Sequence, residues 1–236
     1  MRRCFLFSWI CVFAACAAPS AEEESYSDIQ IVSAMRNVMW RGELGAKIYL
    51  DTLSDKRGLY GVGPVEGLRG ELLINDGVAY ISRVAPDSSI LMEESYEVGA
   101  PFFVYANVNE WAEQPLPDSI ATIAQLETYL DENTRTAKRP FVFKLSGTVV
   151  RANYHVQNLA PGTRVSSPQE AHSGQVKYVL ENEPVELIGF FSTDHQTVFT
   201  HHDTYLHLHL ITQDKTRMGH LDAVELGAMR LFLPVR

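Results

Sequence analysis

The stretch TYLHLHLITQDKTRMGH, residues 204–220, contains three histidines that are separated by apolar residues and by a polar break. In its first half, leucine and histidine alternate. Successive side chains of a β-strand point to opposite faces of the sheet. We therefore predict a strand whose leucines pack in a core, while His207 and His209 share the opposite face.

The polar residues QDKT predict a turn that joins this strand to an antiparallel partner. If the turn is centred between Asp214 and Lys215, His209 lies opposite His220, because both are equally far from that centre. Directly opposed strand residues have Cβ atoms ~4.5–5.5 Å apart, a distance that two imidazoles can bridge through one metal ion. The sequence thus predicts that His207, His209 and His220 bind one Zn2+ and leave a coordination position open for water or substrate.

The remaining histidines of this region lack that symmetry. His201 and His202 precede a predicted turn, and we interpret them as flanking or alternative ligands. His172 and His195 are interpreted as solvated or hydrogen-bonded side chains, which is the usual state of an isolated strand histidine. A row of histidines on an exposed barrel face remains the alternative for the main trio.

The length, composition and net charge of the chain indicate what kind of protein it is. The chain has 236 residues, of which 46% are hydrophobic and 21% charged, which is typical of one large or two small globular domains. Its formal net charge is -9, and lysines and arginines are scattered along it. This pattern argues against nucleic-acid binding, and a small anionic substrate would need a local positive charge, for example from a metal ion.

Residues 1–21 are predicted to be an export signal. Two arginines precede an apolar run from Cys4 to Ala15, which is too short for an ordinary transmembrane helix of ~20 residues. The sequence VFAAC resembles a lipoprotein cleavage box that would acylate Cys16, and cleavage after Ala17 is the alternative. We expect a periplasmic, envelope-anchored or secreted protein that contacts the membrane only through a lipid.

The chain up to residue 138 combines helical and strand patterns. SAMRNVMWRGEL predicts a helix that ends at Gly42, and the sequence NDG, residues 75–77, predicts a hairpin turn. The clearest helix, in PDSIATIAQLETYLDEN, is expected to start with Asp118 or Ser119 as its cap. PFFVYANV, residues 101–108, is expected to end a further strand pair.

Beyond the basic connector RTAKRP, almost every segment has the character of a strand. FVFKLSGTVVRANYHV, residues 141–156, is expected to form a strand pair, and further strands are expected in VKYVL, VELIGFFS, YLHLHLIT and MRLFLPVR. We place a boundary near Lys138, with an N-terminal α/β part at 22–138 and a β-rich, metal-binding part at 139–236.

These segments resemble the α-acetolactate decarboxylase family. The resemblance rests on YLHLHLITQDKTRMGH and GELLINDG, and SAMRNVMWRGEL, PFFVYANV, FVFKLSGTV and VELIGFF occur in the same order. It implies an α+β fold with an N-terminal mixed β-sheet and helices, a C-terminal β-barrel-like part, and a homodimer. It also implies three zinc ligands, His207, His209 and His220, and a catalytic glutamate at Glu71.

The family converts α-acetolactate to acetoin and carbon dioxide, and this sequence departs from its pattern in several places. The family's active-site arginine aligns with His155, and Arg151 is the nearest arginine. Pro64 stands where threonine is common, and a family tail with a second glutamate is not matched by LFLPVR. Asp222 is expected either to accept a hydrogen bond from His220 or to be solvated.

Three hypotheses follow. The first is a zinc-dependent decarboxylase of α-acetolactate, or of a related 2-hydroxy-3-oxo acid, in which Glu71, His155 and Arg151 are the catalytic candidates. The second is a non-catalytic or repurposed domain that binds zinc or a small ligand. The third is a different metal-assisted lyase or hydrolase that uses Glu71 or His155 as its base. Without the family resemblance, the sequence alone would favour Glu71 as a surface strand residue.

Overall fold

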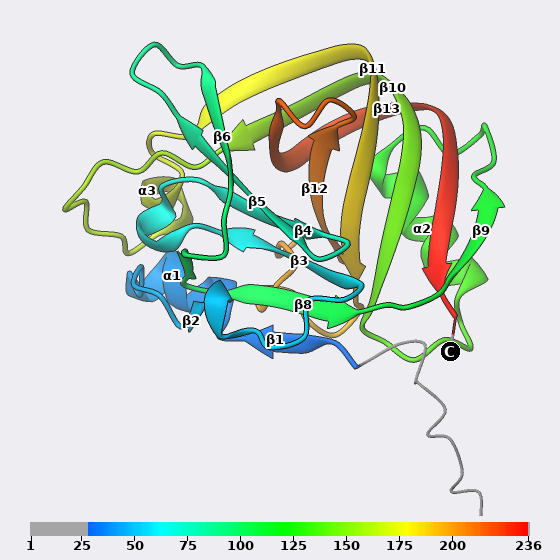
Figure 1. Ribbon diagram of the computed structural model, residues 1–236, viewed down its shortest axis with the longest axis horizontal. Coiled ribbons are helices and arrows are strands. Elements are labelled where there is room, and N and C mark those ends of the chain that lie inside the picture. The colour runs from blue at the N-terminus through cyan, green and yellow to red at the C-terminus, as the bar shows by residue number, and fades with distance from the viewer. Residues whose placement is uncertain (1–27, 236) are drawn as a thin grey trace, which may run out of the picture.

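The computed structural model describes residues 28–235, so the predicted export signal and Cys16 lie outside the described residues. Within this range, two antiparallel sheets make up most of the chain (Figure 1). One sheet occupies the centre and left of the view, and the long strands of the other curve around its right and upper sides. None of the helices described is long and apolar enough to cross a membrane.

The N-terminal sheet has six strands, and its central hairpin follows the predicted NDG turn. Asp76 and Gly77 both have positive φ and join the two strands of that hairpin. All pairings in this sheet are antiparallel, so the expectation of a mixed sheet is wrong. In spatial order the strands are β1 (Gln30–Val32), β8 (Phe103–Asn107), β3 (Leu59–Pro64), β4 (Glu71–Asn75), β5 (Val78–Val84) and β6 (Ile90–Glu94).

Strand β8 does not form the hairpin expected from the sequence. It pairs with β1 and β3, whereas β6, the strand of similar length that precedes it, pairs with β5. A separate two-stranded sheet joins β2 (Ile48–Tyr49) to β7 (Gly99–Ala100).

The C-terminal sheet has five strands, three of them unusually long. The segment predicted as a strand pair is one continuous strand, β10, which bends without a turn at Gly147 and at three irregularities of its pairing register. β10 pairs with two strands that are themselves separated by another strand of the sheet, so the sheet curls back on itself in a barrel-like manner. In spatial order the strands are β10 (Phe141–Val156), β11 (Val176–Phe191), β12 (Leu206–Thr212), β13 (Met218–Pro234) and β9 (Trp111–Pro115).

Strand β9 precedes residue 138 and nevertheless pairs with the end of β13. The first part of the chain thus contributes an edge strand to the second sheet. That the chain divides into two domains near residue 138 stays a prediction.

The helices are few and short. α1 (Met35–Arg41) ends as predicted at Gly42, which adopts the left-handed conformation. α2 (Ile123–Asn133) starts later than expected, because Thr122 and Gln125 form a reciprocal capping box that Asp118 and Ser119 do not provide. The other helical segments are α3 (Pro168–Ala171), η1 (Leu50–Thr52) and η2 (Glu66–Leu68).

The packing of β12 explains where the histidines lie. Leu206, Leu208 and Leu210 belong to the apolar core beneath α2, as the alternation predicts. The opposite face of the strand, which includes buried Ile211, packs toward the N-terminal sheet. His207 and His209 share that face, so the histidine cluster lies between the two sheets.

Candidate metal centre

The three predicted ligands converge in the structure. His209 and His220 are register partners across the β12–β13 hairpin, as the turn symmetry predicted. All three imidazoles are buried, and one nitrogen from each lies within 4.8 Å of the others. The ring centres of His207 and His209 lie 5.0 Å and 5.3 Å from that of His220. Two strands therefore bring the nitrogen atoms of three side chains to one point.

Burial keeps these rings neutral. It lowers the pKa of His207 to about 3, and it lowers the pKa values of His209 and His220 well below the ordinary value, because the charged form loses its hydration. The backbone carbonyls of Phe199 and Leu72 oppose part of this effect at His207 and His209. A neutral imidazole offers a lone pair, which is the form that binds a metal.

The donor set fits a divalent ion such as zinc. Nε2 of His207 lies 3.2 Å from Nε2 of His209. Two nitrogens bound tetrahedrally at ~2.0–2.1 Å are separated by roughly 3.3 Å. A cation between the facing Nε2 atoms would accept the lone pairs that these two neutral rings direct toward each other.

Glu71 reaches this cluster from the N-terminal sheet. It begins β4, is only 2% exposed, and places Oε2 3.7 Å from Nε2 of His209. Its Oε1 accepts a hydrogen bond from the backbone N–H of Gln157. Burial raises the pKa of Glu71 well above the ordinary value, partly offset by that hydrogen bond. The reading of Glu71 as a surface strand residue is wrong.

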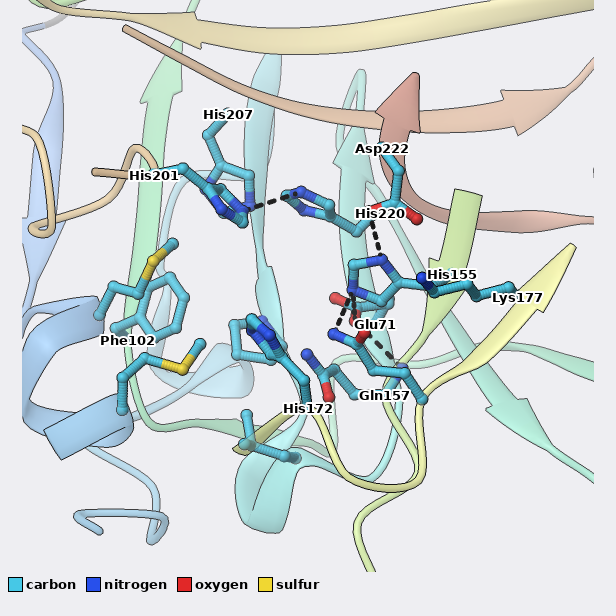
Figure 2. A pocket seen from close by; sticks show the side chains of 15 residues that line it. Glu71, Phe102, His155, Gln157, His172, Lys177, His201, His207, His220 and Asp222 are labelled. Atoms are coloured by element: carbon cyan, nitrogen blue, oxygen red, sulfur yellow. Dashed lines mark hydrogen bonds and ion pairs between the residues drawn. The ribbon is translucent and has the colours of Figure 1, made fainter. Parts of the chain in front are cut away.

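His155 lies at the same cluster and is held by two polar side chains (Figure 2). Its Nδ1 lies 2.7 Å from Oδ1 of Asp222, and its Nε2 lies 3.1 Å from Nε2 of Gln175. Because the amide of Gln175 donates, the network is satisfied when Nδ1 carries the proton. Nε2 of His155 also lies 3.9 Å from Oε1 of Glu71.

Arg151 lies away from the histidine cluster. It shares a strand with His155, but four residues of strand span ~13 Å. Its guanidinium is half exposed and pairs with Glu181, and it borders a separate hollow with Asn153 and Glu225. The structure therefore does not bring this candidate together with the histidines.

The cluster opens into a cavity of about 210 Å³. Apolar side chains from α1 and its surroundings form one wall, namely Met35, Met39, Leu68 and Phe102. Polar residues that the sequence reasoning did not select form the other, namely Gln157, Gln175 and Lys177, together with His172, which was interpreted as a bystander. Pro64 also lines the cavity. Among the described residues of this lining, Lys177 is the only lysine or arginine.

The sequence could have indicated Lys177 as a site residue only if the pairing of β10 with β11 had been known. Lys177 lies directly opposite His155 in the β10–β11 register. The lysine thus stands beside the position that the family arginine would occupy. His195, by contrast, is a bystander as expected, since its Nδ1 lies 2.7 Å from Oγ of Ser192.

A family model described as Alpha-acetolactate decarboxylase matches residues 31–234. The chain belongs to the alpha-acetolactate decarboxylase family. An alpha-acetolactate decarboxylase of Brevibacillus brevis is 26% identical over 215 residues, which cover 86% of this chain and 72% of the relative. One from Methanosarcina mazei is 27% identical over 173 residues, which cover 72% of this chain and 56% of the relative.

Solved structures show the same fold. Acetolactate decarboxylase from Bacillus subtilis subspecies spizizenii has a TM-score of 0.73 at 18% identity, with 89% of this chain and 87% of that chain covered. A Staphylococcus aureus protein of unknown function, similar to alpha-acetolactate decarboxylase, has a TM-score of 0.71 at 15% identity, with 86% and 84% covered. The alpha-acetolactate decarboxylase family thus accounts for the fold of almost the whole described chain.

Proposed function

We propose that this protein is a zinc-dependent decarboxylase that converts α-acetolactate, or a related 2-hydroxy-3-oxo acid, to acetoin and carbon dioxide. The observation that carries the proposal is the 3.7 Å approach of Glu71 Oε2 to His209 Nε2. It places a buried carboxyl group beside three convergent imidazoles, so that an acid and a metal centre face one small cavity.

His207, His209 and His220 would hold the metal. A bound zinc ion supplies a Lewis acid that polarises substrate oxygens. Protein side chains would deliver the proton, bind the substrate and exclude water. Glu71 holds a proton at its carboxyl group, within reach of a carbon atom in the cavity, and can deliver it after carbon dioxide has left.

The polar wall binds and orients the substrate. The ammonium group of Lys177 would attract the substrate carboxylate, a role that the family's arginine would otherwise serve. Asp222 fixes the ring of His155, and His155 in turn borders Glu71. On the opposite side, the apolar wall that includes Met35 and Phe102 excludes water from the reacting carbon.

The decisive assay uses protein purified from cells that express the full chain. Bound zinc is measured per chain, and acetoin formation from α-acetolactate is followed with and without a chelator. One zinc ion per chain and chelator-sensitive acetoin formation are expected. One zinc ion with no acetoin would exclude the decarboxylase and favour the second candidate, a non-catalytic zinc or ligand-binding domain.

That second candidate has one specific observation in its favour. His155 aligns with the family's arginine, and Arg151, the nearest arginine along the chain, pairs with Glu181 and borders a different hollow. The variant His155→Arg separates the two: a gain of acetoin formation indicates a weakened decarboxylase, and no change indicates a repurposed cavity.

Export and dimer formation belong to the proposal as well. Residues 1–21 carry the sequence features of an export signal, and Cys16 is the candidate for lipid attachment. Mass spectrometry of the purified N-terminus distinguishes acylated Cys16 from cleavage after Ala17. Analytical ultracentrifugation tests the homodimer.

A further inference from the structure

His201 lies against the histidine cluster, although it is not one of the three ligands expected for this family. Its Nε2 lies 3.2 Å from Nε2 of His220. The ring centres of His201 and His220 are 5.0 Å apart, the same separation as between His207 and His220. Figure 2 shows the rings of His201 and His220 facing each other at the top of the cavity.

The loop that carries His201 is anchored on both sides. On one side, the carbonyl of Thr200 accepts a hydrogen bond from the backbone N–H of Thr197, and Thr200 is fully buried. On the other, the hydroxyl of Thr204 and the backbone N–H of Tyr205 both donate to the carboxylate of Glu127 on α2, at 2.6 Å each. Only three residues connect these anchors, so the position of the His201 backbone is closely limited.

We propose that His201 is a fourth nitrogen ligand of the metal centre. The four rings form two pairs with Nε2 atoms 3.2 Å apart, namely His207 with His209 and His201 with His220. Each of these two separations is close to the roughly 3.3 Å edge of a tetrahedral zinc site with bonds of ~2.0–2.1 Å. The nitrogens that all lie within 4.8 Å of one another are those of His207, His209 and His220, so the ring of His201 has to move closer to complete the site. The proposal rests on the metal-binding part of the proposed function and not on its reaction.

A fourth imidazole changes the character of the site. Four protein ligands complete the coordination of a structural zinc, whereas a catalytic zinc keeps one position open. His201 borders both the cavity of Glu71 and a second hollow of about 360 Å³ that Glu127 lines. In the proposed site His201 therefore fills the position that a catalytic zinc keeps open for substrate.

X-ray absorption spectroscopy of the zinc-loaded full chain counts the imidazole ligands. We expect four in the wild-type protein and three, with one oxygen, in His201→Ala. His202→Ala is the matched control, because His202 is the exposed neighbour in the same loop, and it should retain four. Three imidazoles in the wild-type protein, or four in His201→Ala, would overturn the proposal.

Chelator competition gives a second readout that does not depend on activity. Loss of an outer-shell partner weakens metal affinity by ~10–100-fold, so His201→Ala should weaken zinc affinity by at least that factor, and His202→Ala should not. Wild-type protein that binds no zinc would contradict the metal centre itself. Three imidazoles in an active decarboxylase would contradict only the role of His201, and four without acetoin formation would contradict only the reaction.

Discussion

Oδ1 of Asp222 lies 2.7 Å from Nδ1 of His155, and not against the ring of His220 as strand parity suggested. The register explains the difference. Asn153 pairs with Ala223 and Tyr154 pairs with Leu221, so Asp222 is the extra residue of a bulge in β13. A bulge re-aims the side chain of its extra residue, and here it points the carboxylate across to β10.

Asp222→Asn should lower acetoin formation without releasing zinc. A hydrogen bond to a charged group contributes ~1.5–3 kcal/mol, which corresponds to a loss of roughly 10- to 100-fold in kcat if the bond positions His155 for turnover. Zinc content and kcat are measured together. Unchanged kcat would show that the orientation of His155 has no part in the reaction.

Glu71→Gln should retain zinc and lower kcat by ~10²–10⁴, the range typical of a lost general acid or base. The amide preserves the shape of the buried side chain but cannot deliver a proton. Steady-state kinetics and metal analysis on the same preparation test this. Full activity in this variant would remove Glu71 from the mechanism.

His209→Ala should abolish metal loading and the stabilisation that it provides. A ligand present at ~100 times its Kd stabilises the folded protein by ~2.7 kcal/mol. Chelation should therefore lower the Tm of the wild-type protein and leave the Tm of His209→Ala unchanged. An equal decrease in both proteins would place the metal elsewhere.

Lys177→Met should raise KM for the anionic substrate about two- to fivefold, because an exposed charge interaction contributes ~0.2–1 kcal/mol. Arg151→Met is the matched control: it removes one positive charge from the neighbouring part of the same sheet, but Arg151 borders a different hollow. Equal effects of the two substitutions would indicate a general charge effect in place of a specific contact.

Gly189→Ala should destabilise the strand that supports the histidines. A Cβ atom at this position would lie 2.3 Å from Cζ of Phe143 and 2.7 Å from Cδ2 of Leu208. Overpacking of this kind costs ~1–3 kcal/mol, measurable by denaturant unfolding. Gly45→Ala is the control, since no atom lies within 4 Å of the added group and the unfolding free energy should change little.

Local patterns in the sequence were sufficient for the elements with strong periodicity. The hairpin at Asp76–Gly77, the end of α1 at Gly42 and the opposition of His209 and His220 all follow from turn chemistry or strand alternation. The long strand β10 was misread as a pair, because Gly147 resembles a turn residue locally, while its neighbours on both sides keep the strand continuous. Alternation also cannot reveal a bulge, which is why the sequence left Asp222 either beside His220 or solvated and did not predict its contact with His155.

The sequence by itself determined the three-histidine hairpin, since a period of two and a symmetric turn bring those rings to one face. The family resemblance added Glu71. Only the tertiary structure decided that Glu71 is buried against His209, that Arg151 is excluded, and that Lys177 and His201 join the site. These contacts join segments far apart in the chain, and their distances depend on how two sheets pack, which no local pattern encodes.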